Sequence, residues 1–233
     1  MTGPADETAA AFTLDAFHRG DFWVAQPAKG GHRSGMDAMM LAAAVPTGFA
    51  GRLVDLGAGA GAAGMAVASR CAGARVDLVE NAPQMAAFAR LTCAHERNAH
   101  LAPRVSVIEA DVALAGRQRA AAGLADNAYE AAIMNPPFNA AVDRATPSAL
   151  KRSAHVMTDT TFESWLRTAA ALVRPRGMVA LIARPASLPA LLSALEGRFG
   201  GAQIVPVHPR SEEAAIRIVV RARRGARAGL TLF

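Results

Sequence analysis

Residues 131–138, Ala131-Ala132-Ile133-Met134-Asn135-Pro136-Pro137-Phe138, change abruptly from an apolar run to an amide, two prolines and an aromatic ring. Proline has no N–H for a sheet hydrogen bond and fixes its own φ, so a buried strand must stop at Asn135. The segment after it forms a stiff corner that holds the Asn135 amide and the Pro136 carbonyl oxygen in place. The simpler interpretation is an ordinary turn, since Asn-Pro and Pro-Pro are common turn dipeptides.

This corner has the parts that a flat substrate with an NH2 group needs. Its two oxygen acceptors take the protons of the amine, and the ring of Phe138 stacks on the planar system while Pro137 keeps the corner stiff. We therefore expect a nitrogen to react here, and the candidate catalytic residues are Asn135, Pro136, Pro137 and Phe138.

The rest of the chain alternates short apolar runs with amphipathic helical segments. Such alternation predicts an α/β protein with a doubly wound parallel sheet. We predict a mostly parallel seven-stranded sheet with an antiparallel pair at its edge and helices on both faces. The predicted strands are 52–56, 75–79, 104–109, 129–134, 177–183, 202–207 and 214–220, and the predicted helices are 62–70, 83–98, 113–124, 162–173 and 188–199, the last closed by Gly200-Gly201.

Three segments are expected along the chain. Residues 1–13 are small and polar and should be disordered. Residues 14–50 form a short N-terminal extension or lid, with a hairpin at 17–26 and a helix that runs to Val45. Residues 51–233 form the main domain, in which a polar loop at 139–158 should bind substrate.

Composition excludes several classes of protein. No window of the 233 residues approaches the roughly 18 apolar residues of a membrane helix, and no basic-then-apolar leader is present, so we expect a cytoplasmic protein. Cys71 and Cys93 lack Cys or His partners at metal spacing, and the six histidines are scattered, so no metal is expected.

The net charge is +6, from 25 Lys+Arg against 19 Asp+Glu. A basic surface favours association with RNA or DNA. Residues 221–227 are rich in arginine and are expected to form a basic tail along an RNA backbone. A solvated basic end, or arginine usage set by codon bias, explains the same residues equally well.

A glycine-rich loop, Gly57-Ala58-Gly59-Ala60-Gly61, lies between the first predicted strand of the sheet and a helix. With Gly64 it matches the dinucleotide fingerprint, so a nicotinamide enzyme is one interpretation. Asp55 precedes the loop by two residues, and its carboxylate repels a pyrophosphate but binds an ammonium group. We therefore favour a nucleoside that carries an amino acid and no phosphate.

S-adenosylmethionine has this chemistry. Glu80 and Asp111 also follow predicted strands, and in open α/β sheets ligands bind at these strand ends. Glu80 would accept from the ribose hydroxyls and Asp111 from the adenine amine, although both acids are also compatible with solvated strand ends. The candidate cofactor residues are Asp55, Gly57, Ala58, Gly59, Gly61, Glu80, Asn81, Asp111, Val112 and Asn135.

Two motifs together resemble those of the class I S-adenosylmethionine-dependent methyltransferases, which are Rossmann-like. Residues 54–61 resemble the first motif of this class. Asn135-Pro136-Pro137-Phe138 resembles the motif of those members that methylate adenine N6 or a glutamine side chain. From about residue 15 to the end, including residues 26–43 and 207–210, the chain is similar to the bacterial tRNA1(Val) adenine-37 N6-methyltransferase group of the small-domain type. His32 and Phe138 depart from its pattern, because an aromatic residue and a tyrosine are commoner there.

The resemblance implies methyl transfer to adenine N6 in RNA, with a tRNA as the expected substrate. A protein glutamine N5-methyltransferase, or a non-catalytic module that binds S-adenosylmethionine and RNA, are the alternatives. Arg33, Asp37, Lys151 and Arg152 are candidate substrate-binding residues, although Asp37 also suits the first turn of a helix.

Overall fold

The computed structural model describes residues 12–28, 33–136 and 150–233, and only the backbone of residues 150–160. Within these ranges, eight strands form the main sheet in the order β10-β8-β9-β7-β6-β3-β4-β5. The strands β3 to β7 are mutually parallel where they pair, and β9 runs antiparallel to both β7 and β8. The strands are β3 (Ala50–Leu56), β4 (Gly73–Glu80), β5 (Val105–Glu109), β6 (Tyr129–Met134), β7 (Val173–Ala183), β8 (Phe199–Val207), β9 (Arg217–Arg224) and β10 (Thr231–Leu232).

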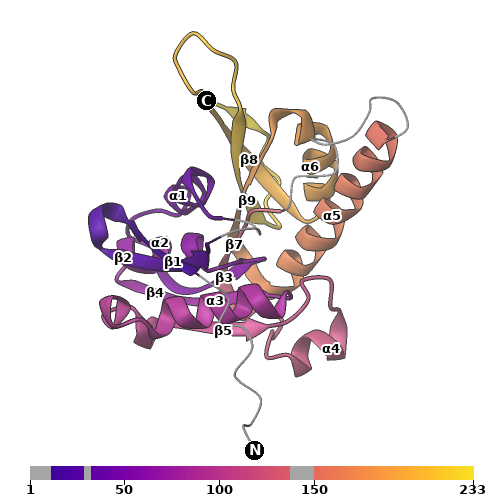
Figure 1. The fold of residues 1–233 in the computed structure, drawn as a ribbon. Coiled ribbons are helices and arrows are strands. Elements are labelled where there is room, and N and C mark those ends of the chain that lie inside the picture. The colour runs from indigo at the N-terminus through magenta and orange to yellow at the C-terminus, as the bar shows by residue number, and fades with distance from the viewer. Residues whose placement is uncertain (1–11, 29–32, 137–149) are drawn as a thin grey trace, which may run out of the picture.

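Helices cover both faces of this sheet, as Figure 1 shows. The face with α1 (Met36–Ala43), α2 (Ala62–Arg70) and α3 (Pro83–Ala94) lies opposite the face with α5 (Leu150–Leu172) and α6 (Leu188–Leu195). A short helix, α4 (Gly116–Ala121), lies between β5 and β6. Short 3-10 turns occur at His18–Gly20, Glu96–Asn98, Ala102–Arg104 and Pro185–Ser187.

Two hydrophobic cores fill the space between sheet and helices. Successive residues of a strand point to opposite faces, so Leu53 packs in the core of the α1–α3 face while the next residue, Val54, packs in the core of the α5–α6 face. Both side chains are fully buried. Strands that are apolar on both faces are typical of a parallel sheet covered on two sides.

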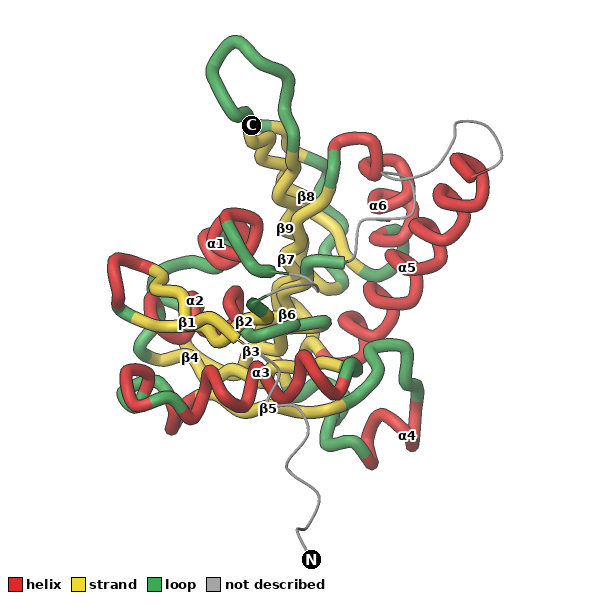
Figure 2. Tube along the Cα trace, viewed as in Figure 1, coloured by secondary structure: helices red, strands yellow, loops and turns green. Residues whose placement is uncertain are grey.

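An N-terminal hairpin lies against the edge of α3 (Figure 2). Its strands, β1 (Phe12–Phe17) and β2 (Phe22–Pro27), pair with each other in a separate antiparallel sheet. The buried Asn98 ties the hairpin to the domain, because its Oδ1 accepts from Trp23 N at 2.9 Å and its Nδ2 donates to Trp23 O at 2.7 Å. The pairing of β1 with β2 confirms the predicted hairpin. Its first strand begins at Phe12, inside the segment 1–13 that was expected to be disordered.

The predicted α/β architecture is confirmed, including the antiparallel pair β8–β9. The seven predicted strands are all present, and the two-residue β10 adds an eighth within the described chain. Gly200-Gly201 does not close a helix, because α6 ends at Leu195 and both glycines lie in β8. Gly200 is needed there for a close approach, since a Cβ would lie 2.2 Å from Ala226 O.

Two further secondary-structure assignments are wrong, whereas the binding roles expected of these segments stay predictions. The loop expected at 139–158 gives way to α5 at Leu150, because polar residues without Gly or Pro do not interrupt a helix. The part of that loop at 139–149 lies outside the described residues. The basic tail at 221–227 is largely strand β9, where Arg221 Nε donates to Gln203 Oε1 at 2.9 Å and Arg224 donates to Val173 O.

No helix in the described part of the chain is long and apolar enough to cross a membrane. Cys71 is buried and Cys93 is half-buried, both as free thiols. Among the residues described, no three His, Cys, Asp or Glu side chains gather to hold a metal ion.

Candidate active site

The strands β3 and β6 are neighbours in the middle of the sheet. From β3 the next strands of the chain, β4 and β5, are added on one side, and from β6 the next strand, β7, is added on the other side. A crevice opens at such a switch point, at the carboxyl ends of the strands. A cavity of about 570 Å³ occupies this position. It is lined by Ser34, Asp37, Ala38, Asp55, Gly57, Ala58, Gly59, Ala63, Glu80, Asn81, Met85, Asp111, Val112, Asn135, Pro136, Trp165, Arg184 and Arg217.

The structure places most of the predicted site residues around this one cavity. Each predicted cofactor residue lines it except Gly61, which is the N-cap residue of α2. Of the predicted catalytic residues, Asn135 and Pro136 line it, whereas Pro137 and Phe138 lie outside the described residues.

The glycine loop forms the floor of the cavity. The Gly57 and Ala58 N–H groups both donate to Val79 O at 2.9 Å, which fastens the loop to β4. Gly57 has a φ of 71°, and a Cβ built on it would lie 2.4 Å from Cη2 of Trp165. Glycine is therefore required at this position for its backbone conformation and for the close approach of the indole ring.

Asp55 lies beneath this loop, almost completely buried. Its Oδ2 accepts a hydrogen bond from Gly64 N at 2.9 Å. Burial raises the pKa of the Asp55 carboxyl to about 7, and the nearby Glu80 adds to the rise, while the hydrogen bond from Gly64 opposes it. A cation in the cavity would therefore favour the ionised form of Asp55.

Glu80 and Asp111 shape the neighbouring loops. Glu80 Oε2 accepts from Gly59 N at 2.8 Å, and its Oε1 accepts from Ala82 N at 2.9 Å. Asp111 Oδ1 accepts from Ala113 N at 2.7 Å. A carboxylate oxygen has two lone pairs, so each of these groups keeps acceptor capacity for a ligand hydroxyl or amine.

Asn135 has an unused acceptor. Its Oδ1 is buried and has no hydrogen-bond partner among the described residues. Such an atom costs free energy unless a ligand supplies a donor. A second cavity of about 250 Å³ also reaches Asn135, and its lining is Arg33, Ser34, Gly35, Met36, Asp37, Ala38 and Asn135. Asn135 thus borders both cavities.

Of the predicted substrate-binding residues, Arg33 and Asp37 line the second cavity. Arg33 is held to the hairpin, since its guanidinium contacts Asp15 Oδ2 and Pro27 O, both at 2.6 Å. Asp37 Oδ2 accepts from Arg217 Nε at 2.9 Å. Lys151 and Arg152 lie in α5, in the part described only as backbone.

Sequence reasoning missed Trp165, Met85, Arg184 and Arg217, which also line the main cavity. Trp165 has no local signal, because one aromatic residue in an amphipathic helix indicates only packing. A signal did exist for Arg184, since it directly follows β7, and polar residues at strand ends had already indicated the other site residues.

The chain matches the methyltransferase small domain over residues 34–206, which is more than half its length. This chain belongs to the methyltransferase small-domain family. The methyltransferase is 43% identical to a predicted O-methyltransferase from Agrobacterium tumefaciens, Atu636, with a TM-score of 0.73 over 84% of this chain and 85% of that one.

More distant solved structures share the fold of the methyltransferase. The 16S rRNA N2 G1207 methyltransferase from T. thermophilus, in complex with AdoMet and guanosine, is 20% identical, with a TM-score of 0.60 over 91% of this chain and 50% of that one. TrmN from Thermus thermophilus is 20% identical, with a TM-score of 0.53 over 81% of this chain and 47% of that one. No match is found among curated protein sequences.

The cofactor of the methyltransferase is S-adenosylmethionine, and the main cavity fits it. Three carboxylates, Asp55, Glu80 and Asp111, surround a glycine loop in which no basic side chain is present to hold a pyrophosphate. These acceptors suit a cationic ligand whose ribose hydroxyls and amine donate hydrogen bonds, and they disfavour a dinucleotide. The expectation of a methyltransferase that uses this cofactor is confirmed.

Proposed function

We propose that the enzyme methylates the exocyclic N6 of adenine in RNA, with a tRNA as the substrate. The observation that carries the proposal is the buried Oδ1 of Asn135, which borders both cavities and has no hydrogen-bond partner within residues 12–28, 33–136 and 150–233. A base in the second cavity would bring its amine to this oxygen, with the cofactor in the main cavity on the other side.

Asn135 and Pro136 would orient the amine. When bound, S-adenosylmethionine supplies a methyl group on a positively charged sulfonium, which is already a strong electrophile. Asn135 Oδ1 and Pro136 O would each accept a hydrogen bond from one N–H of the amine. These two hydrogen bonds would turn the nitrogen lone pair toward the methyl carbon and stabilise the developing positive charge. In this transfer the N–C bond would form as the S–C bond of the bound cofactor broke, the electron pair of the S–C bond would stay on sulfur, and the nitrogen would then lose one proton to water.

The remaining predicted residues complete this arrangement. Phe138 would stack on the base after the base leaves its own stack, and Pro137 would keep the corner stiff. Residues 14–50 would act as the extension that covers the substrate, because the second cavity is lined by residues 33–38. An RNA-modifying enzyme of this kind would work in the cytoplasm.

A labelling experiment tests the proposal. Purified enzyme is incubated with radiolabelled S-adenosylmethionine and total tRNA from a strain that lacks the gene, and the RNA is digested to nucleosides. We expect label in N6-methyladenosine. Label in N2-methylguanosine would contradict the choice of adenine, and label in a mixture of release factors and ribosomal proteins would favour glutamine. No label with intact cofactor binding would favour a non-catalytic module.

Asn135→Ala supplies the matching variant. It should abolish methylation and leave the Kd for S-adenosylmethionine within about threefold, because the amide oxygen serves the substrate. Gln118→Ala is a control, since Gln118 is an exposed amide on α4 away from both cavities. Equal loss of cofactor binding and of activity in Asn135→Ala would assign Asn135 to the cofactor instead.

A further inference from the structure

The carboxyl edge of the sheet carries an ordered series of charges. In the strand order β4, β3, β6, β7, β9, the side chains at this edge change from acidic through neutral to basic. The antiparallel β9 contributes its first residue, because its Ile218 pairs with Ala183 at the end of β7. The series is Glu80, Asp55, Asn135, Arg184 and Arg217, and all five line the main cavity.

These side chains share one face of the sheet. On β6, Ile133 belongs to the core of the α1–α3 face and Met134 to the opposite core, so Asn135 points to the α1–α3 face. On β7, Ile182 belongs to the same core as Ile133, and Arg184 has the same parity.

Register sets the height of Arg184 above the reacting position. Met134 pairs with Leu181, so Ile182 is level with Asn135. Arg184 therefore lies two residues farther along the neighbouring strand, which corresponds to about 7 Å at roughly 3.3 Å per residue. The side chain is thus placed beside the reacting position and nearer to solvent.

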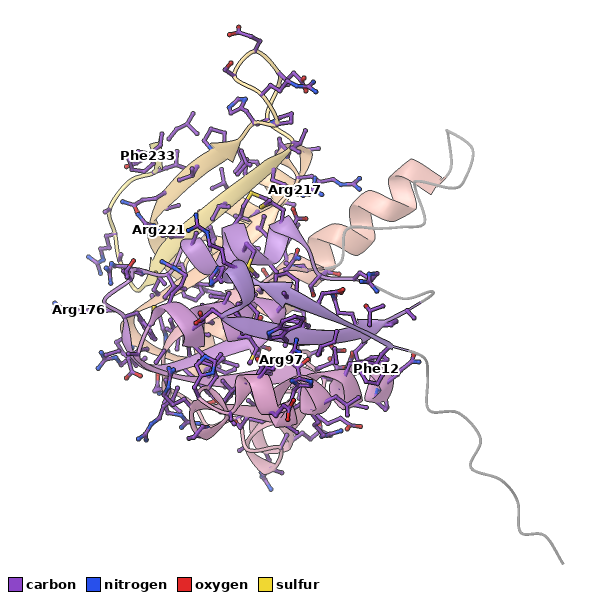
Figure 3. The ribbon with its side chains drawn as sticks, turned by 60° about the vertical axis from the view of Figure 1, so that its left-hand side comes forward. Phe12, Arg97, Arg176, Arg217, Arg221 and Phe233 are labelled. Carbon is purple, nitrogen blue, oxygen red and sulfur yellow. The ribbon has the colours of Figure 1, made fainter. Side chains whose placement is uncertain are left out.

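The two arginines differ in their exposure to solvent. Arg217 is half-buried and lies 2.9 Å from Asp37; Figure 3 shows it on the strand next to α1. Arg184 is exposed to solvent at the mouth of the cavity. A large anionic substrate therefore meets Arg184 before it meets Arg217.

We propose that Arg184 binds the phosphate of the target nucleotide and so fixes the base at Asn135. This inference rests on the proposed function. A guanidinium matches a phosphate with two parallel hydrogen bonds, and the phosphate is joined to the base through the ribose, away from the reacting amine. The acidic half of the cavity repels a phosphate and attracts the cationic cofactor, so each ligand is directed to its own half.

Binding measurements on RNA test the inference. In the Asn135→Ala background, which cannot react, Arg184→Ala should raise the Kd for tRNA about tenfold at low salt. The magnitude of the slope of log K against log salt should fall by about 0.7 for one lost contact to a single-stranded phosphate. Arg184→Lys should keep the salt slope and recover part of the affinity. The Kd for S-adenosylmethionine should stay unchanged.

Arg176→Ala is the matched control. Arg176 is an exposed arginine of the same strand at its opposite end, far from Arg217 in Figure 3. The substitution Arg176→Ala should change neither the Kd nor the salt slope of tRNA binding. In enzyme with Asn135 intact, Arg184→Ala should raise KM for tRNA more than it lowers kcat.

The outcomes separate the two proposals. If the enzyme forms N6-methyladenosine in tRNA and Arg184→Ala binds tRNA with an unchanged salt slope, the inference about Arg184 is wrong and the proposed function stands. If Arg184→Ala weakens RNA binding as expected but no N6-methyladenosine forms with Asn135 intact, the choice of reaction is wrong and the phosphate contact stands. A protein that binds no RNA would overturn both.

Discussion

Replacing Asp55 by asparagine should make the free protein more stable at neutral pH while weakening its hold on the cofactor. Asp55 is almost fully buried, and its pKa is raised from 3.8 to about 7, mainly by burial. A shift of this size corresponds to about 4 kcal/mol. Asparagine keeps an oxygen that can accept from Gly64 N–H and carries no charge to desolvate.

The direction of the pH dependence follows from the raised pKa. Below about pH 4 the Asp55 carboxyl is protonated in both the folded and unfolded states, so its burial desolvates no charge and the free energy of unfolding is at its highest with respect to this group. Between about pH 4 and 7 the unfolded chain ionises first, and the free energy of unfolding therefore falls as pH rises. Asp55→Asn lacks this fall, so its advantage over the original protein should grow with pH to at most about 4 kcal/mol.

Urea unfolding at pH 5 and pH 8 without cofactor measures this effect. Calorimetry with S-adenosylmethionine measures the opposite effect, because the cationic ligand needs the ionised carboxylate. The affinity of the original protein should rise with pH toward 7 with release of a proton, and Asp55→Asn should bind weakly with no such rise. Asp111→Asn, an exposed carboxylate at the same cavity, is the control and should keep the rise. A stability difference that is the same at both pH values would refute the reasoning.

Three further predictions concern single side chains. Gly57→Ala should lower both Tm and cofactor affinity, because φ of this residue is 71° and the added methyl group would lie 2.4 Å from Trp165. Making the same change together with Trp165→Leu should restore only part of the loss, since the backbone strain remains. Tyr129→Phe should cost about 1–2 kcal/mol in urea unfolding with little change in kcat, because Tyr129 Oη donates to Asp77 Oδ2 at 2.8 Å far from the cavity; unchanged stability would contradict this. Burial raises the pKa of Cys93 to about 11, so iodoacetamide at pH 8 should label it slowly in the folded protein and rapidly in urea, as peptide mass spectrometry would show.

The parts of the site marked by local sequence were accessible to prediction. Asp55 and Glu80 lie at the carboxyl ends of apolar strands and Asn135 directly follows one, and the carboxyl ends of parallel strands meet at one edge. Because alternation of strands and helices predicts a parallel sheet, these three residues were expected around one cavity, where the structure places them.

Other features depend on contacts between distant segments. The arginines of β9 looked like a tail because basic residues continue past the apolar run, and only pairing with β7 and β8 shows that they are part of a strand. Trp165 reaches the glycine loop from a helix that is more than 100 residues away in the chain. Neither fact has a signal in the local sequence, since both arise from tertiary packing.

The ion pair between Asp37 and Arg217 joins residues that are 180 positions apart in the sequence, one in α1 and one in β9. During synthesis the chain leaves the ribosome from its N-terminus. The acidic residues at the ends of β3 and β4 emerge early, whereas Arg184 and Arg217 emerge only after most of the protein has been made. A nascent chain therefore contains the acidic residues that we expect to hold the cofactor long before it contains the two arginines.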